Sequence, residues 1–72
     1  MYLRRSEFAR IRTVLAESDV DEPLTAREIH RLLCEHDEAL DSPHRVATVL
    51  GRRAETGDVR VFDDQPYRYR LR

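Results

Sequence analysis

The chain contains no lysine and no tryptophan, only one cysteine and only two glycines. A single cysteine excludes an intramolecular disulfide, so covalent cross-links cannot hold the fold together. No apolar run approaches the roughly 20 residues that cross a bilayer, and the first residues lack the basic, apolar and cleavage segments of a secretory signal. We therefore expect a soluble, cytoplasmic protein with no membrane partner.

Positive charge is carried by arginine alone. The 13 basic residues are outnumbered by 14 acidic ones, for a formal net charge of -1. Such a composition is typical of a salt-adapted, halophilic host or of a GC-rich genome. A domain near neutrality attracts nucleic acid poorly unless its arginines are gathered on one surface. The positions of the arginines along the chain therefore decide which partners are plausible.

The length allows one small domain, which we place over residues 1–72. Hydrophobic residues make up 40% of the chain and charged residues 38%. These proportions indicate a folded domain with a heavily charged surface rather than a disordered tail.

Two helices are predicted in the first half of the chain. Apolar residues recur at helical spacing over residues 3–17, and the acidic segment that ends at Pro23 stops this helix. A second helix begins at Thr25, because its hydroxyl can cap the amide of Glu28 while Glu28 reaches back to the Thr25 amide. A polar connector follows, anchored by Leu40.

A third helix is predicted over residues 43–56. Ser42 supplies a capping hydroxyl, Pro43 stands at the first helical position, and Gly57 stands where a left-handed terminator is expected. Gly51 lies inside this helix, where glycine costs about 1 kcal/mol relative to alanine. Either tight packing or the close approach of a ligand would explain it.

Residues 58–62 and 67–71 predict a β-hairpin, since both are rich in β-branched and aromatic residues and are joined by a turn-forming segment. In the second strand, alternation places an apolar set on one face and an arginine row on the other. The apolar set is Tyr67, Tyr69 and Leu71, and the row is Arg68, Arg70 and Arg72.

This order of elements resembles the winged helix-turn-helix family of DNA-binding transcriptional regulators. The resemblance is carried by Leu24–Leu33, by Ser42–Leu50 and by Glu55–Val59. It implies an α+β fold of three helices followed by a two-stranded β-hairpin wing. It also implies that the third helix enters the major groove of double-stranded DNA while the wing touches the neighbouring backbone or minor groove.

Eight residues are the candidate DNA contacts. Arg45 is the best candidate base reader, because its forked guanidinium can bind both O6 and N7 of guanine. His44 and Thr48 are further base contacts at the leading end of the helix. The candidate phosphate contacts are Ser42, Arg52, Arg60, Arg68 and Arg70.

The alternative is that these arginines are merely solvated, or that the wing arginines pair with acids. The candidate acids are Asp58, Asp63 and Asp64. The last two stand at the wing tip, where their carboxylates disfavour deep insertion into a minor groove.

Arg53 departs from the family pattern, because similar domains place an apolar residue there, following Val49 and Leu50. We expect its aliphatic stem to lie over the edge of the core with its charge paired to an acid. The alternative interpretation is that Arg53 faces a partner subunit.

These features favour a sequence-selective DNA-binding regulator that acts as a homodimer through helix one, with Tyr2 and Phe8 at the interface. The alternative is a winged helix that serves protein–protein interaction without binding DNA. The near-neutral charge and the acidic run over residues 35–41 support this alternative.

Enzymatic activity and cofactors are not expected. Gly51 and Gly57 cannot form a glycine-rich phosphate loop, and no nucleophile motif is present. His30 and Cys34 stand one helical turn apart, but no paired Cys-x-x-Cys motif accompanies them. We therefore expect no metal, and interpret Cys34 as a small core residue.

Overall fold

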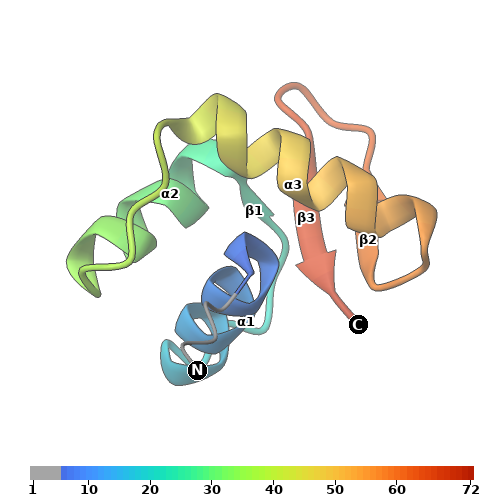
Figure 1. Cartoon of the computed structure of the whole chain (residues 1–72). Coiled ribbons are helices and arrows are strands. Elements are labelled where there is room, and N and C mark those ends of the chain that lie inside the picture. Colours follow the sequence, from blue (N-terminus) through green and yellow to red (C-terminus); the bar gives the residue numbers. More distant parts are fainter. Residues whose placement is uncertain (1–5) are drawn as a thin grey trace.

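The computed structural model describes residues 6–72, which form a small α+β domain of three helices and three strands. In chain order the elements are α1 (Glu7–Glu17), β1 (Leu24–Thr25), α2 (Ala26–Glu35), α3 (Pro43–Glu55), β2 (Val59–Phe62) and β3 (Arg68–Leu71). Figure 1 shows α3 running along one side of the molecule, with α2 near its start and the sheet near its end. This arrangement is compatible with a winged helix.

The sheet has three antiparallel strands in the order β1-β3-β2, so the predicted two-stranded hairpin was wrong in strand number. The additional strand is Leu24–Thr25, which pairs with β3 in the register Leu24 to Tyr69 and Thr25 to Arg68. A strand of two residues shows no alternation, and its partner lies far along the chain. Sequence periodicity therefore cannot indicate it.

The predicted helix caps are present. Thr25 and Glu28 form a complete capping box at the start of α2, and the Ser42 hydroxyl accepts a hydrogen bond from the Arg45 amide at the start of α3. Gly57 has φ +88°, the left-handed conformation expected of a helix terminator. Local side-chain chemistry thus fixes where α2 begins and where α3 begins and ends.

α1 begins at Glu7, later than the residue 3 suggested by apolar spacing, and Leu3 lies outside the described residues. The reason is a cap: Ser6 has extended backbone angles, and its hydroxyl accepts a hydrogen bond from the Ala9 amide at 3.0 Å.

The core lies between the three helices and one face of the sheet. Its ten buried residues come from all three helices, the α2–α3 connector and two strands. They are Phe8, Ile11, Val14, Ile29, Leu33, Leu40, Val46, Leu50, Val59 and Tyr69. The burial of Leu40 confirms its predicted role as the anchor of the connector.

Side chains from α1 and α2 fix the connector that leads into α3. The Arg10 guanidinium donates to the carbonyls of Glu38 at 3.1 Å and Ala39 at 2.9 Å. His30 Nε2 lies 3.1 Å from the Leu40 carbonyl, which only accepts, so this nitrogen carries the proton. The start of α3 is therefore held by both preceding helices.

Of the helices that the structure describes, none combines the length and the apolar character needed to cross a membrane.

Candidate nucleic-acid interface

α3 presents one side to the core and the other to solvent. Val46 and Leu50 are fully buried, so helical geometry turns the opposite side outward. His44, Arg52 and Glu55 are exposed, and Thr48 and Gly51 are partly exposed between them. We call this surface the α3 ridge, and it consists of His44, Thr48, Gly51, Arg52 and Glu55.

The polar groups of the ridge are unequally available. The Thr48 hydroxyl donates to the His44 carbonyl at 3.1 Å, which leaves its lone pairs and methyl group for a ligand. Arg52 forms no ion pair with any residue from 6 to 72. It is therefore the charge on the ridge that an anion can reach without displacing a protein group.

Gly51 lies in the ridge with open space outside it. A Cβ atom built at this position has no heavy atom within 4 Å. Tight packing within the described chain therefore does not explain a helical glycine that costs about 1 kcal/mol relative to alanine. The structure thus excludes one of the two explanations that the sequence offered and does not test the other, the close approach of a ligand.

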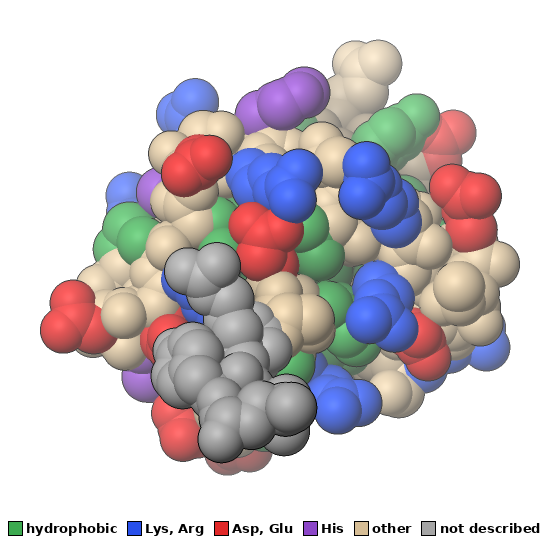
Figure 2. All heavy atoms as spheres, viewed as in Figure 1, with side chains coloured by type: hydrophobic (Ala, Val, Ile, Leu, Met, Phe, Trp, Pro, Cys, Tyr) green, Lys and Arg blue, Asp and Glu red, His purple; other side chains and the backbone are tan. Residues whose placement is uncertain are grey.

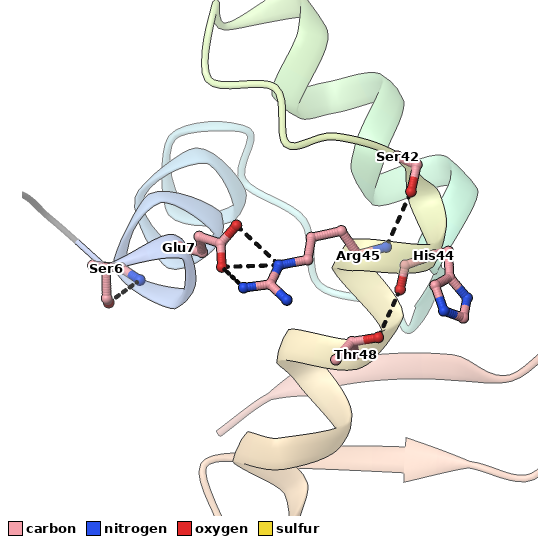
Figure 3. A network of polar contacts seen from close by, with 7 residues as sticks. Ser6, Glu7, Ser42, His44, Arg45 and Thr48 are labelled. Carbon is pink, nitrogen blue, oxygen red and sulfur yellow. Dashed lines mark hydrogen bonds and ion pairs between the residues drawn. The ribbon is translucent and has the colours of Figure 1, made fainter.

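Arg45, on the flank of the ridge, is bound to Glu7 at the start of α1 (Figure 3). Its Nε donates to the two carboxylate oxygens at 3.0 and 3.1 Å, and its Nη2 donates to Glu7 Oε1. Local patterning does not indicate this pair, because the residues are 38 positions apart. The predicted main base reader is thus held by an acid that sequence analysis did not identify.

The ion pair is fully charged near neutral pH. The hydrogen bond from Arg45 holds the pKa of Glu7 below its ordinary value, and the charges of Arg45, Arg10 and Arg52 act in the same direction against partial burial. The same hydrogen bond raises the pKa of Arg45. Figure 2 shows an acidic side chain among arginine side chains on this face. Glu7 therefore offsets part of the positive charge beside the ridge.

A groove of about 460 Å³ borders the other flank of the ridge. Its walls include Arg27 at the start of α2, Ala47 of α3, and Pro66 and Tyr67 of the β2–β3 loop. The Tyr67 side chain is 53% exposed. The sequence did not indicate that Arg27 and Tyr67 line a groove, because Arg27 resembles any solvated helix residue and strand alternation placed Tyr67 with the core side chains.

Arg53 packs as the sequence predicted. Its guanidinium lies 4.6 Å from the centroid of the Phe8 ring, and its Nη1 lies 3.3 Å from Asp58 Oδ2. Phe8 is only 7% exposed, so it belongs to the core and offers no surface for the expected dimer. Tyr2, the other residue of that expected interface, lies outside the described residues.

The predicted wing arginines lie on a different surface from the ridge. In the register of the hairpin, Arg60 is opposite Arg70 and Phe62 is opposite Arg68. Neighbouring residues such as Tyr69 point the other way, into the core beneath α3. The outer face of the sheet therefore turns away from α3, and the eight candidate residues form two surfaces rather than one.

One of the three wing arginines, Arg68, pairs with acids, as the alternative interpretation of the sequence predicted. Arg68 lies 3.6 Å from Glu28 and 3.7 Å from Asp64, and it donates to the Pro23 carbonyl at 3.5 Å. Arg60 and Arg70 form no ion pair within residues 6–72. The two remaining arginines are thus available to an external anion.

Residues 6–72 contain no group of three or more histidine, cysteine or acidic side chains that could hold a metal ion. His30 Nδ1 faces Cys34 Sγ at 3.8 Å, and His36 Nδ1 lies 3.0 Å from the Leu32 carbonyl. The interpretation of Cys34 as a core residue was wrong, because its side chain is exposed.

The chain matches no known protein-family model, no curated protein and no solved structure.

Proposed function

We propose that this chain is a double-stranded DNA-binding domain of a transcriptional regulator, with the α3 ridge in the major groove. The observation that carries the proposal is the ridge itself: an outward helix face with His44, Thr48 and Arg52, and with Gly51 in open space. A major groove accepts one α-helix. A glycine on the outer face lets a groove wall come closer to the helix backbone.

The ridge supplies two kinds of contact. His44 and Thr48, near the start of α3, face base edges, where they donate, accept or offer a methyl group. Arg52 and the Ser42 hydroxyl contact phosphates, and Arg27 lies on the far flank as a further phosphate contact. Ser42 accepts from the Arg45 amide at 3.3 Å, and its hydroxyl hydrogen remains available as a donor.

Arg45 can contribute to base reading while it stays bound to Glu7. The carboxylate occupies one edge of the guanidinium, through Nε and Nη2. The hydrogens of Nη1 and the second hydrogen of Nη2 remain free to bind the two acceptors of guanine. Glu7 also repels a nearby phosphate. In this proposal Glu7 weakens binding to any duplex that does not offer Arg45 a good partner.

The test is a titration of mixed duplex fragments with the chain over a salt series, followed by fluorescence anisotropy. Arg52→Ala removes one phosphate contact, so its salt slope falls by about 0.9 and its affinity falls on all fragments. Arg31→Ala is the matched control, because Arg31 is an exposed arginine of α2 outside the ridge. Undetectable binding of wild type at low salt, or equal losses in both variants, would overturn the proposal.

A second copy on the same duplex would extend the recognised sequence to two half-sites. The stoichiometry of the same titration measures this, since a dimeric reader saturates at two chains per duplex.

The second candidate function is protein–protein interaction without DNA binding. Glu7 offsets Arg45, Glu55 stands on the ridge, and Tyr67 is an exposed aromatic beside it. Aromatic side chains are enriched at protein interfaces. This candidate leads if wild type binds no duplex at low salt.

A further inference from the structure

The outer face of the sheet brings together two arginines of like charge. Arg60 of β2 and Arg70 of β3 are directly opposite in the antiparallel register. Opposite residues have Cβ atoms about 5 Å apart, and like charges in this position destabilise a sheet. An anion bound between them would offset this repulsion.

The two acids that flank β2 are engaged elsewhere, and two others, Asp21 and Glu22, line a separate pocket with Arg70 and Arg72. Asp58, just before β2, is bound by Arg53 and by the Thr56 hydroxyl at 2.9 Å. Asp64, just after β2, lies 3.7 Å from Arg68. Within the part of the chain that the structure describes, no carboxylate pairs with Arg60 or Arg70.

The two arginines border a cleft of about 490 Å³ that Phe62 and Arg72 also line. The Arg60 guanidinium lies 5.2 Å from the centroid of the Phe62 ring, a cation–π contact that restricts where its charge can be. The Arg72 amide donates to the Asp58 carbonyl at 3.0 Å, which fixes the backbone at the rim of the cleft. Three arginine residues therefore line one open, partly apolar cleft.

We propose that this cleft binds a phosphate group between Arg60 and Arg70, with Arg72 at the rim. A phosphate group offers several charged oxygens, so two guanidinium groups can each form paired hydrogen bonds with it. A single carboxylate has only two oxygens, and one guanidinium group is enough to bind both. The group comes either from a small phosphorylated ligand or from a nucleic-acid backbone. The inference does not depend on the proposed function, because the ridge lies on another surface.

The primary experiment is a titration of the full chain with inorganic phosphate, compared with sodium chloride at equal ionic strength. Thermal unfolding and the NMR signals of the arginine side chains report binding. Wild type should show a saturable rise in Tm that sodium chloride does not reproduce. Arg70→Gln should bind phosphate about tenfold more weakly, because it loses one charge-assisted partner.

The variant also separates binding from folding. In sodium chloride Arg70→Gln should unfold at the same or a higher temperature than wild type, because a like-charge contact is removed. Arg31→Gln, with the same charge change, should keep the wild-type response to phosphate. A phosphate effect that is absent in wild type, not saturable, or unchanged in Arg70→Gln would overturn the proposal.

A competition experiment with duplex DNA distinguishes the two sources of phosphate. If a duplex competes with inorganic phosphate for the cleft, the source is a nucleic-acid backbone; if both bind at once, it is a small ligand. Arg52→Ala should leave the phosphate response intact, so failure of the ridge and failure of the cleft are distinguishable. Concentration-dependent self-association that Arg70→Gln abolishes, without any phosphate effect, would instead assign the cleft to the carboxylates of a second copy.

Discussion

The guanidinium of Arg45 binds the carboxylate of Glu7, with Nε 3.0 and 3.1 Å from its two oxygens. This contact joins the start of α1 to the first turns of α3, where the candidate base readers lie (Figure 3). In the proposed complex, Glu7 orients Arg45 and offsets part of its charge, so the acid affects the affinity for DNA as well as the arginine.

Glu7→Gln should strengthen binding to duplex DNA. The substitution removes a negative charge beside the ridge and weakens the hold on Arg45, so we expect roughly a two- to fivefold gain in affinity at low salt, in keeping with a partly exposed ion pair. Anisotropy titrations of wild type and variant measure it.

Two further variants show whether the gain depends on Arg45. Glu17→Gln makes the same charge change at the other end of α1 and should alter affinity less. In the Glu7→Gln, Arg45→Ala double variant the gain should disappear. An equal gain from Glu7→Gln and Glu17→Gln would show that the contact between Glu7 and Arg45 does not affect DNA binding.

The ion pair also predicts a pH dependence of stability. The pKa of Glu7 is lowered from its ordinary value of 4.5, first by the hydrogen bond from Arg45. A carboxyl group whose pKa is lower in the folded state stabilises the fold above its unfolded pKa, and this contribution is lost as pH falls through the folded pKa.

Denaturant unfolding of wild type and Glu7→Gln should therefore differ near neutral pH and converge in acid. The comparison cancels other carboxyl groups, such as Glu28, whose pKa is lowered by its hydrogen bond from the Thr25 amide. A difference that persists unchanged well below pH 4.5 would contradict the assignment.

Gly51→Ala should change stability and binding in opposite directions. Alanine meets nothing within 4 Å at this position, so we expect a gain in the free energy of unfolding of about 0.5–1 kcal/mol. For a domain of this size such a gain raises Tm by several degrees. The added methyl group should weaken duplex binding by keeping the groove wall away from the helix.

Gly57→Ala is the contrasting control. Its φ of +88° is unfavourable for a side chain, so this variant should lose stability. If Gly51→Ala left duplex affinity untouched while raising Tm, the proposed close approach at this glycine would be wrong.

Thr25 should tolerate serine but not alanine. Its hydroxyl accepts from the Glu28 amide at 3.1 Å, and loss of an N-cap hydroxyl costs about 0.5–2 kcal/mol. Thr25→Ser keeps the cap and should stay close to wild type in thermal unfolding. Equal destabilisation by both substitutions would show that the methyl group, rather than the cap, matters.

Local chemistry predicted much of this fold. The Thr25–Glu28 capping box, the Ser42 cap and the Gly57 terminator each involve residues a few positions apart, so their signal is contained in a short window of sequence. The position of the Arg53 side chain over the edge of the core was predictable, because an arginine stands where similar domains have an apolar, core-facing residue.

Contacts between distant segments were not predictable in this way. β1 exists because Leu24 and Thr25 meet Tyr69 and Arg68 across the sheet. The Glu7–Arg45 pair likewise depends on how α1 crosses α3. The candidate arginines formed a single set along the sequence, and only the register of the hairpin separates those on the sheet from those near the ridge.

Thr25 is at once the last residue of β1 and the N-cap of α2, with φ -73° and ψ 161°. No linker separates the sheet from the helix, so a single residue sets the angle between them. The direct connection, together with the capping box, restricts how far β1 can rotate relative to α2. The exposed loop over residues 63–67, which joins β2 to β3, carries no such restraint from a helix cap.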